Sequence, residues 1–256
     1  MSNTGNTHSR SRLRAVHISL GILLLALSAP AWGGGQQESA EQSTDVEAGD
    51  AEVPSERGGS RERGRVEIPE GHERVVLAGG CFWCMEPPFD EVDGVHAITT
   101  GFAGGDVENP TYRQAVSGGT GHQEVVEVIY DPQQLSFREI MDVFWMNVDP
   151  VDSGGQFCDR GSVYETGIFY ETGEQREVAV ETRDAIDEAG VLDSAIVTEI
   201  RELDTFYPAE EEHQAYYRKN PTRYRFYVQS CGRENRLEQL WGELVDEDNG
   251  SLLDNL

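Results

Sequence analysis

Basic residues are scarce in this chain of 256 residues. It has 20 Lys and Arg against 47 Asp and Glu, which gives a formal net charge of −27 at pH 7. A charge of this sign is repelled by the phosphate backbone of nucleic acids and by anionic membrane surfaces. The composition therefore argues against nucleic acid and against a stable membrane partner. We interpret the acidity itself as a contribution to solubility or an adaptation to salty surroundings.

Cysteine is also rare, and none precedes Cys81. The four cysteines are Cys81, Cys84, Cys158 and Cys231. Two of them form one close pair and the other two are isolated, so their spacing predicts no metal site. An even number permits two disulfides, but a domain of this size can build its own core without them. A redox role for the cysteines therefore competes with a structural one.

Long hydrophobic runs are absent as well. The apolar stretch at 20–27 is too short to indicate a membrane span. It follows Arg10, Arg12 and Arg14 and precedes Ala29-Pro30-Ala31, which is the pattern of an export signal. We predict a signal peptide at 1–31 and an exported, periplasmic protein. A signal that stays uncleaved and anchors the chain is the alternative.

The remaining chain divides into three parts. Residues 32–68 lack hydrophobic periodicity and are rich in Gly, Glu, Ser and Gln, so we predict a disordered acidic linker there. Residues 69–246 are predicted to form one folded domain, and 247–256 a short tail. No internal repeat is visible.

Hydrophobic periodicity predicts the elements of the folded domain. Strands are expected at 74–78, 94–101, 123–130, 163–170 and 195–199, and helices at 82–92, 112–117, 137–147, 173–189, 210–219 and 234–245; residues 224–228 indicate an extended segment. This order predicts an α/β (α+β) two-layer sandwich with a ferredoxin-like β-α-β-β-α-β core and C-terminal helical additions.

Cys81 stands where a strand gives way to a helix. An apolar run ends in Gly79-Gly80, and the thiol follows at the start of the next predicted helix. Unpaired N–H groups and the positive end of the helix dipole stabilise a thiolate at such a position. We therefore predict that Cys81 is a nucleophile. The nearby Cys84 leaves thiol–disulfide exchange open as an alternative activity.

Several motifs occur in order along the domain. They are Gly80-Cys81-Phe82-Trp83, Asn109-Pro110-Thr111-Tyr112, Gly121-His122-Gln123-Glu124, Phe157-Cys158-Asp159-Arg160-Gly161-Ser162, Glu211-Glu212-His213-Gln214 and Lys219-Asn220-Pro221. Together they resemble the type A peptide methionine sulfoxide reductases (MsrA) over residues 74–242. The resemblance implies an oxidoreductase, a peptide-methionine (S)-S-oxide reductase that repairs oxidised proteins or reduces free methionine sulfoxide. It also implies no bound cofactor, a thioredoxin-like dithiol as reductant, and a monomer.

The resemblance also assigns roles to individual residues. Glu124 lies in the most apolar predicted strand, where burial would raise the pKa of its carboxyl group and make it an acid catalyst. The hydroxyls of Tyr112 and Tyr164 are expected to hydrogen-bond the sulfoxide oxygen. Phe82 and Trp83 would form an apolar wall for the substrate methyl group, and Asp159 would provide a carboxylate that shapes the site. Glu86 and His213 are expected to be structural supports.

A second thiol is needed after the first step. Reduction of a sulfoxide would leave a sulfenic acid on Cys81, which another thiol captures as a disulfide. Many family members place this resolving cysteine in a polar C-terminal segment like the one that holds Cys231, although the familiar glycine-rich tail is absent here. We rank Cys231 slightly above Cys84. Cys158 comes third, as a buried bystander.

Two other functions compete with this one. A thiol–disulfide oxidoreductase that uses Cys81 and Cys84 would leave Glu124 and the two tyrosines without a task. A non-enzymatic, disulfide-stapled binding module of the cell envelope would carry two stable bridges and no reactive thiol.

Overall fold

The structure is a computed structural model that describes residues 66–245 and 250–256. The predicted signal at 1–31 and the predicted linker up to residue 65 lie outside the described residues and stay predictions. Within the described part of the chain, none of the helices has the length and apolar character that crossing a membrane requires.

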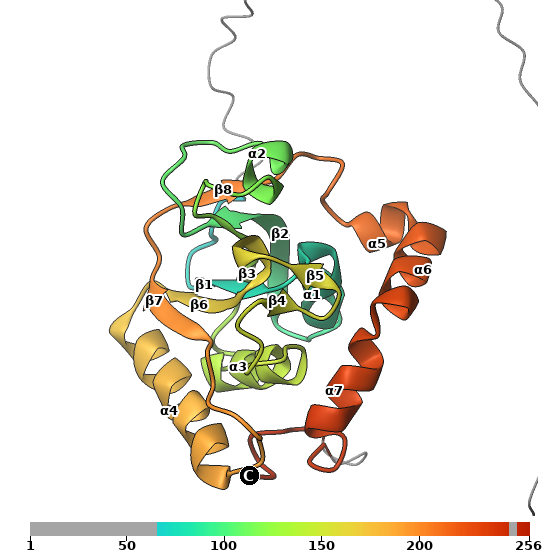
Figure 1. Ribbon diagram of the computed structural model, residues 1–256. Helices are drawn as coiled ribbons and strands as arrows, with labels where there is room; N and C mark the ends of the chain where they lie inside the picture. Colours follow the sequence, from blue (N-terminus) through green and yellow to red (C-terminus); the bar gives the residue numbers. More distant parts are fainter. Residues whose placement is uncertain (1–65, 246–249) are drawn as a thin grey trace, which may run out of the picture. The chain divides into compact units, whose positions relative to one another are not determined.

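A mixed sheet lies at the centre of the described residues (Figure 1). Its strands follow the spatial order β7 (Glu199–Glu202), β6 (Thr166–Tyr170), β1 (Glu73–Gly79), β3 (Gln123–Tyr130), β2 (Val95–Ala103) and β8 (Phe206–Pro208). Neighbouring strands are antiparallel, except that β6 and β7 are parallel. The predicted mixed α/β class is confirmed.

Helices surround this sheet. They are α1 (Phe82–Asp90), α2 (Tyr112–Val116), α3 (Phe137–Met146), α4 (Gly173–Ala189), α5 (Tyr216–Lys219), α6 (Pro221–Cys231) and α7 (Arg233–Trp241). A small hairpin of β4 (Gly155–Gln156) and β5 (Asp159–Arg160) precedes the 3-10 turn η1 (Ser162–Tyr164). Figure 1 shows α4 beside β6 and β7, and α5, α6 and α7 following one another along the opposite side.

Strands β1 and β3 lie side by side in the middle of the sheet and contribute to the hydrophobic core. Every residue of β3 is buried, and apolar side chains of β1 and β3 pack with those of α1 and α3. The buried Trp145 in α3 donates its indole N–H to Thr182 Oγ1 of α4 at 3.0 Å, so its polar atom is satisfied. Leu252 and Leu253, which the sequence assigned to a tail outside the domain, are buried in this same core.

The C-terminal part differs most from expectation. The predicted extended segment at 224–228 is wrong, because these residues lie inside α6. Their aromatic and β-branched side chains favour a strand, but Pro221 at the first turn and Gly232 at the left-handed C-cap favour a helix, and the helix forms. The predicted helix at 210–219 is reduced to α5, because Ala215 takes a left-handed conformation with φ 49°. The strand expected at 195–199 begins only at Glu199.

Candidate active site

A glycine turn delivers Cys81 to the start of α1. Gly80 has φ +86°, and a Cβ on it would lie 2.6 Å from Gln156 Cβ. A Cβ on Gly79 would lie 2.4 Å from the sulfur of Met85, so the turn has no space for side chains. Cys81 follows as the N-cap residue of α1 and is buried.

Replacing Gly80 by alanine should destabilise this turn and lower activity. The positive φ and the contact with Gln156 together cost roughly 2–4 kcal/mol. Gln156 has little freedom to move, because its side chain hydrogen-bonds the backbone of Asp149 at 2.8 Å through both amide atoms. Urea unfolding measures the loss of stability.

The matched control for this substitution is Gly118→Ala. Gly118 has φ +81°, but a Cβ there meets nothing within 4 Å. The control should therefore lose only the conformational contribution, about 1 kcal/mol, and keep its activity. Equal losses for the two variants would contradict a steric role for Gly80.

Cys81 and Cys84 form a pair of free thiols. Burial raises the pKa of the Cys81 thiol well above its ordinary value, and its hydrogen bond with Cys84 and the nearby Glu124 act in the same direction. The hydrogen bond from Cys81 and the positive charge of Arg233 lower the pKa of Cys84. Burial and acidic neighbours therefore act against the thiolate that the N-terminal position on α1 favours.

Glu124 faces Cys81 from the central strand. It is fully buried, and its Oε2 accepts a hydrogen bond from the backbone N–H of Phe82 at 3.1 Å. Burial, and secondarily the charge of Asp159, raise the pKa of Glu124 to about 8. The carboxyl group thus keeps its proton at neutral pH, which is the state that an acid catalyst requires.

Two tyrosine hydroxyls complete this polar centre. Tyr112 begins α2, and its backbone N–H donates to Glu210 Oε1 at 3.1 Å. Burial and Glu124 raise the pKa of Tyr112 to about 12, and the same two causes raise the pKa of Tyr164 in η1. Both hydroxyls therefore remain protonated and available as donors.

Phe82 and Trp83, the two aromatic residues after Cys81, both contact His213 but differ in their other neighbours. Phe82 is buried, with ring centroids of Phe102, Tyr112 and His213 at 5.8, 6.1 and 5.5 Å. Trp83 stacks on Tyr216, with 3.7 Å between ring centroids. Trp83 therefore joins α1 to the C-terminal helices, whereas Phe82 packs in the core beside the ring of Tyr112.

Asp159 reaches the site from β5. Burial raises the pKa of its carboxyl group, while a hydrogen bond donated by the Tyr227 hydroxyl of α6 acts against that rise. Its charge in turn contributes to the raised pKa values of Cys81, Glu124 and Tyr112. The structure thus brings together Cys81, Glu124, Tyr112, Tyr164 and Asp159 from five separate segments.

The other two cysteines are joined to each other. Cys158 and Cys231 form a disulfide with 5.0 Å between their Cα atoms. The prediction of Cys158 as a buried bystander is wrong, because Cys158 is exposed and bonded. Among the described residues, these two cysteines and Asp159 are the one group of three or more His, Cys, Asp or Glu whose possible ligand atoms lie close enough to hold a metal ion, within 4.8 Å of one another. Both sulfurs are used in the disulfide.

Sequence reasoning missed three residues at the site. Tyr216 and Tyr227 were missed because their contacts with Trp83 depend on how the C-terminal helices pack against α1. Arg233 is buried, contacts Met85 Sδ at 3.3 Å and donates to the backbone carbonyl of Asn147. A single arginine in a polar stretch carries no sequence signal for burial.

The two predicted supports do connect elements. Glu86 accepts a hydrogen bond from the backbone N–H of Ala215 at 3.0 Å, and burial raises the pKa of Glu86 to about 7. His213 stacks on Tyr112, with 4.3 Å between ring centroids, and burial lowers its pKa. Both residues join the C-terminal segment to the reacting groups.

Comparisons with known proteins agree with this arrangement. Residues 73–245 match the sequence model of the family described as Peptide methionine sulfoxide reductase. The chain is 46% identical over 180 residues to the peptide methionine sulfoxide reductase MsrA of Bacillus licheniformis, covering 70% of this chain and 99% of the relative. It is 48% identical over 169 residues to the MsrA of Streptococcus agalactiae, covering 66% and 99%.

Solved structures give the same result for the fold. Methionine sulfoxide reductase A of Corynebacterium diphtheriae is similar with a TM-score of 0.55 and 35% identity, covering 62% of this chain and 79% of that one. Reduced Mxr1 of Saccharomyces cerevisiae is similar with a TM-score of 0.57 and 30% identity, covering 62% and 91%.

Proposed function

Because this chain belongs to the peptide methionine sulfoxide reductase family, we propose that Cys81 is the sulfur that attacks its substrate, methionine sulfoxide. The main support is the position of Glu124, which is buried and accepts a hydrogen bond at 3.1 Å from the backbone N–H of Phe82, the residue after Cys81. Its pKa of about 8 keeps the carboxyl group protonated at neutral pH. A sulfoxide becomes a good electrophile only when its oxygen accepts a proton or strong hydrogen bonds. Glu124 supplies that proton, and Tyr112 and Tyr164 supply the hydrogen bonds.

The reaction proceeds without net uptake of protons. Cys81 sulfur bonds to the substrate sulfur while Glu124 protonates the oxygen, and the proton of the thiol restores Glu124. The sulfur–oxygen bond of the substrate and its new bond to the Cys81 sulfur then both break, as the hydroxyl group passes to the Cys81 sulfur. The products are the methionine sulfide, reduced by two electrons, and a sulfenic acid on Cys81, oxidised by two.

We propose that Cys84 resolves this sulfenic acid, which reverses the ranking expected from the sequence. Cys84 lies within hydrogen-bond distance of Cys81, and the positive charge of Arg233 favours its thiolate, so it is placed to attack the sulfenic sulfur. Cys231 is bonded to Cys158 and has no free thiol. Attack of Cys84 on the sulfenic sulfur forms the Cys81–Cys84 disulfide and releases water.

A single-turnover experiment tests both steps. Protein with free Cys81 and Cys84, mixed with a methionine sulfoxide peptide without reductant, should form one equivalent of sulfide and a new Cys81–Cys84 bridge by mass mapping. Cys84→Ser should still form one equivalent of sulfide but keep a sulfenic acid on Cys81, trapped by a cyclic 1,3-diketone. A new bridge to Cys231 would contradict the assignment, and absence of sulfide would contradict the function.

Recycling requires an external dithiol. We infer a thioredoxin-like protein, which would reduce the Cys81–Cys84 bridge to two thiols and itself become a disulfide. Family membership also supports the S epimer as substrate, in oxidised proteins or as the free amino acid.

Export to the periplasm is a separate proposal. It is supported by the basic, apolar and small-residue succession within residues 10–31. The Cys158–Cys231 disulfide agrees with it, because such bridges persist in oxidising compartments. N-terminal sequencing of the protein from a periplasmic fraction tests cleavage after residue 31.

A further inference from the structure

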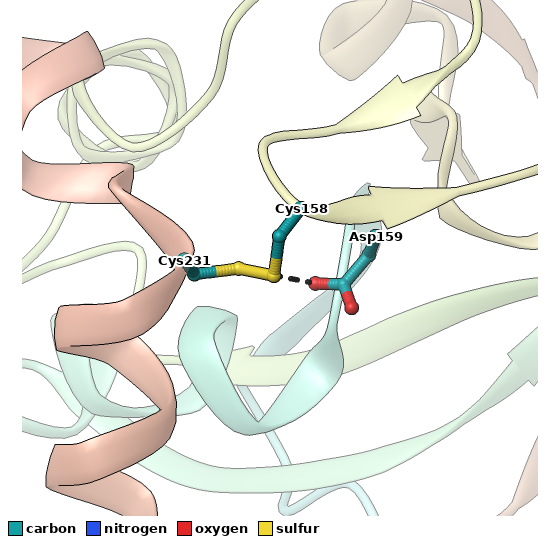
Figure 2. Close-up of side chains that lie close together, drawn as sticks. All are labelled: Cys158, Asp159 and Cys231. Carbon is teal, nitrogen blue, oxygen red and sulfur yellow. Dashed lines mark hydrogen bonds between the residues drawn. A yellow bond between two sulfur atoms is a disulfide. The ribbon is translucent and has the colours of Figure 1, made fainter. Parts of the chain in front are cut away.

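The Cys158–Cys231 disulfide joins two segments that meet at the active site. Cys158 directly precedes Asp159 of β5, and Cys231 is the last residue of α6. Figure 2 shows the Asp159 carboxylate next to the bridge, and Cys231 Sγ lies 4.0 Å from Asp159 Oδ2. A disulfide sulfur carries no proton, so the two groups are in contact without a hydrogen bond. The bridge therefore fixes the end of α6 next to Asp159.

Helix α6 has little other anchorage in the core. None of its residues is buried, and Phe226 is 72% exposed, so apolar burial contributes little to holding the helix in place. Yet α6 supplies Tyr227 to the site. The Tyr227 hydroxyl donates a hydrogen bond to Asp159 Oδ2, and its ring meets Trp83 edge-on, with 6.1 Å between centroids.

The position of Asp159 matters because its charge acts on Glu124. A negative neighbour disfavours a second negative charge, so Asp159 favours the protonated form of Glu124. The titratable groups that act on Glu124 or respond to it are Cys81 and Cys84 of α1, Tyr112 of α2, Asp159 of β5 and Tyr164 of η1. The positive charge of Arg233 in α7 acts on Asp159 and Cys84. Displacement of Asp159 should therefore lower the fraction of Glu124 that is protonated at neutral pH.

We propose that the Cys158–Cys231 disulfide and Tyr227 are positioning elements that together hold the Asp159 carboxylate in place beside Glu124. The bridge fixes the backbone next to Asp159, and Tyr227 fixes its carboxylate. In this role both act through Asp159, and the bridge takes no part in resolving the sulfenic acid. This inference rests on the proposed function, since the acid role of Glu124 comes from it.

Two variants and one control test the proposal. Cys158→Ser/Cys231→Ser removes the bridge, and Tyr227→Phe removes the hydrogen bond while the bridge stays. Tyr217→Phe is the matched control, because the Tyr217 hydroxyl donates a similar hydrogen bond to Asp90, a pair that involves none of the reacting groups. Single-turnover rates without reductant and ¹³C NMR titration of the Glu124 carboxyl group are measured for each protein.

We expect the single-turnover rate constant to fall roughly tenfold in the double variant and in Tyr227→Phe. The pKa of Glu124 should fall below the wild-type value of about 8 in both, because the Asp159 charge is no longer held close. The Tyr217→Phe control should match wild type in both measurements. Exposure of Glu124 would also lower its pKa, so the free energy of unfolding in urea is measured as well; in Tyr227→Phe it should stay within about 1 kcal/mol of wild type.

Several results would overturn the proposal. Wild-type rates and Glu124 titration in both variants would remove the positioning role. Sulfide formation in the double variant without a new Cys81–Cys84 bridge would make Cys158 or Cys231 the resolving thiol. If the double variant does not fold, Tyr227→Phe decides the outcome alone. Absence of sulfide in wild type would instead refute the proposed function.

Discussion

Cys81→Ser should abolish reduction of methionine sulfoxide. A serine hydroxyl is a far weaker nucleophile than a cysteine sulfur, and its oxygen cannot become a sulfenic acid. We expect the single-turnover rate constant for sulfide formation to fall at least about 10⁴-fold, as is usual when a covalent nucleophile is removed. Serine is close to cysteine in size, so the buried N-cap of α1 should keep its structure.

Cys84→Ser is the control for this result. It changes the neighbouring sulfur in the same helix, but on our assignment it spares the first chemical step. Sulfide should therefore form in one equivalent with Cys84→Ser and not at all with Cys81→Ser. If both variants retained the first turnover, the nucleophile would have to be another residue. If both lost it, the pair would act as one unit, as in disulfide exchange.

Glu124→Gln should lower the rate constant of the first turnover by about 10²- to 10³-fold. General acid catalysis contributes about this much, and an amide cannot transfer a proton. The glutamine keeps an oxygen that can accept the hydrogen bond from Phe82, and its amide can still donate to the sulfoxide oxygen. Glu124→Ala loses both functions, so its rate constant should fall further than that of the glutamine variant.

The same glutamine variant should be more stable than wild type at pH 8. The pKa of Glu124 is about 8 in the folded protein against an ordinary value of 4.5. Between these pH values the folded state holds a proton that the unfolded state has released, so stability falls as the pH rises through this range. The loss is on the order of a few kcal/mol.

Urea unfolding at two pH values checks this sign. At pH 8 Glu124→Gln should show the higher free energy of unfolding, whereas near pH 4 the two proteins should be similar, because glutamate is then protonated in both states. A glutamine variant that is less stable than wild type at pH 8 would show that the Glu124 carboxyl group is not held protonated by burial.

Most elements up to α4 were predictable because their signals are local. The strand 123–130 and the helix 173–189 were expected with the bounds that β3 and α4 have, since continuous apolar sequence and a terminal glycine define them. Helix α6 was not predicted, because it buries no residue and so has no apolar stripe to detect. Its tyrosines and valine indicate a strand by propensity alone.

The site divides in the same way. The glycines before Cys81 predict a turn that presents a nucleophile, and a glutamate within an apolar strand predicts a buried acid. The pairing of Cys158 with Cys231 was not predictable in this way, since 73 residues separate them and spacing does not determine connectivity. The contact of Tyr227 with Asp159 depends on how α6 docks, which only the folded structure gives.

The packing of Met85 has a consequence for survival of the protein under oxidative stress. Met85 lies one helical turn from the nucleophile, with its sulfur against Gly79 and Arg233, and is only 1% exposed. Met141 is fully buried too. An oxygen added to the Met85 sulfur would find no space, and oxidants would have little access to either sulfur. An enzyme that repairs oxidised methionine thus keeps two of its own four methionines out of reach of the damage.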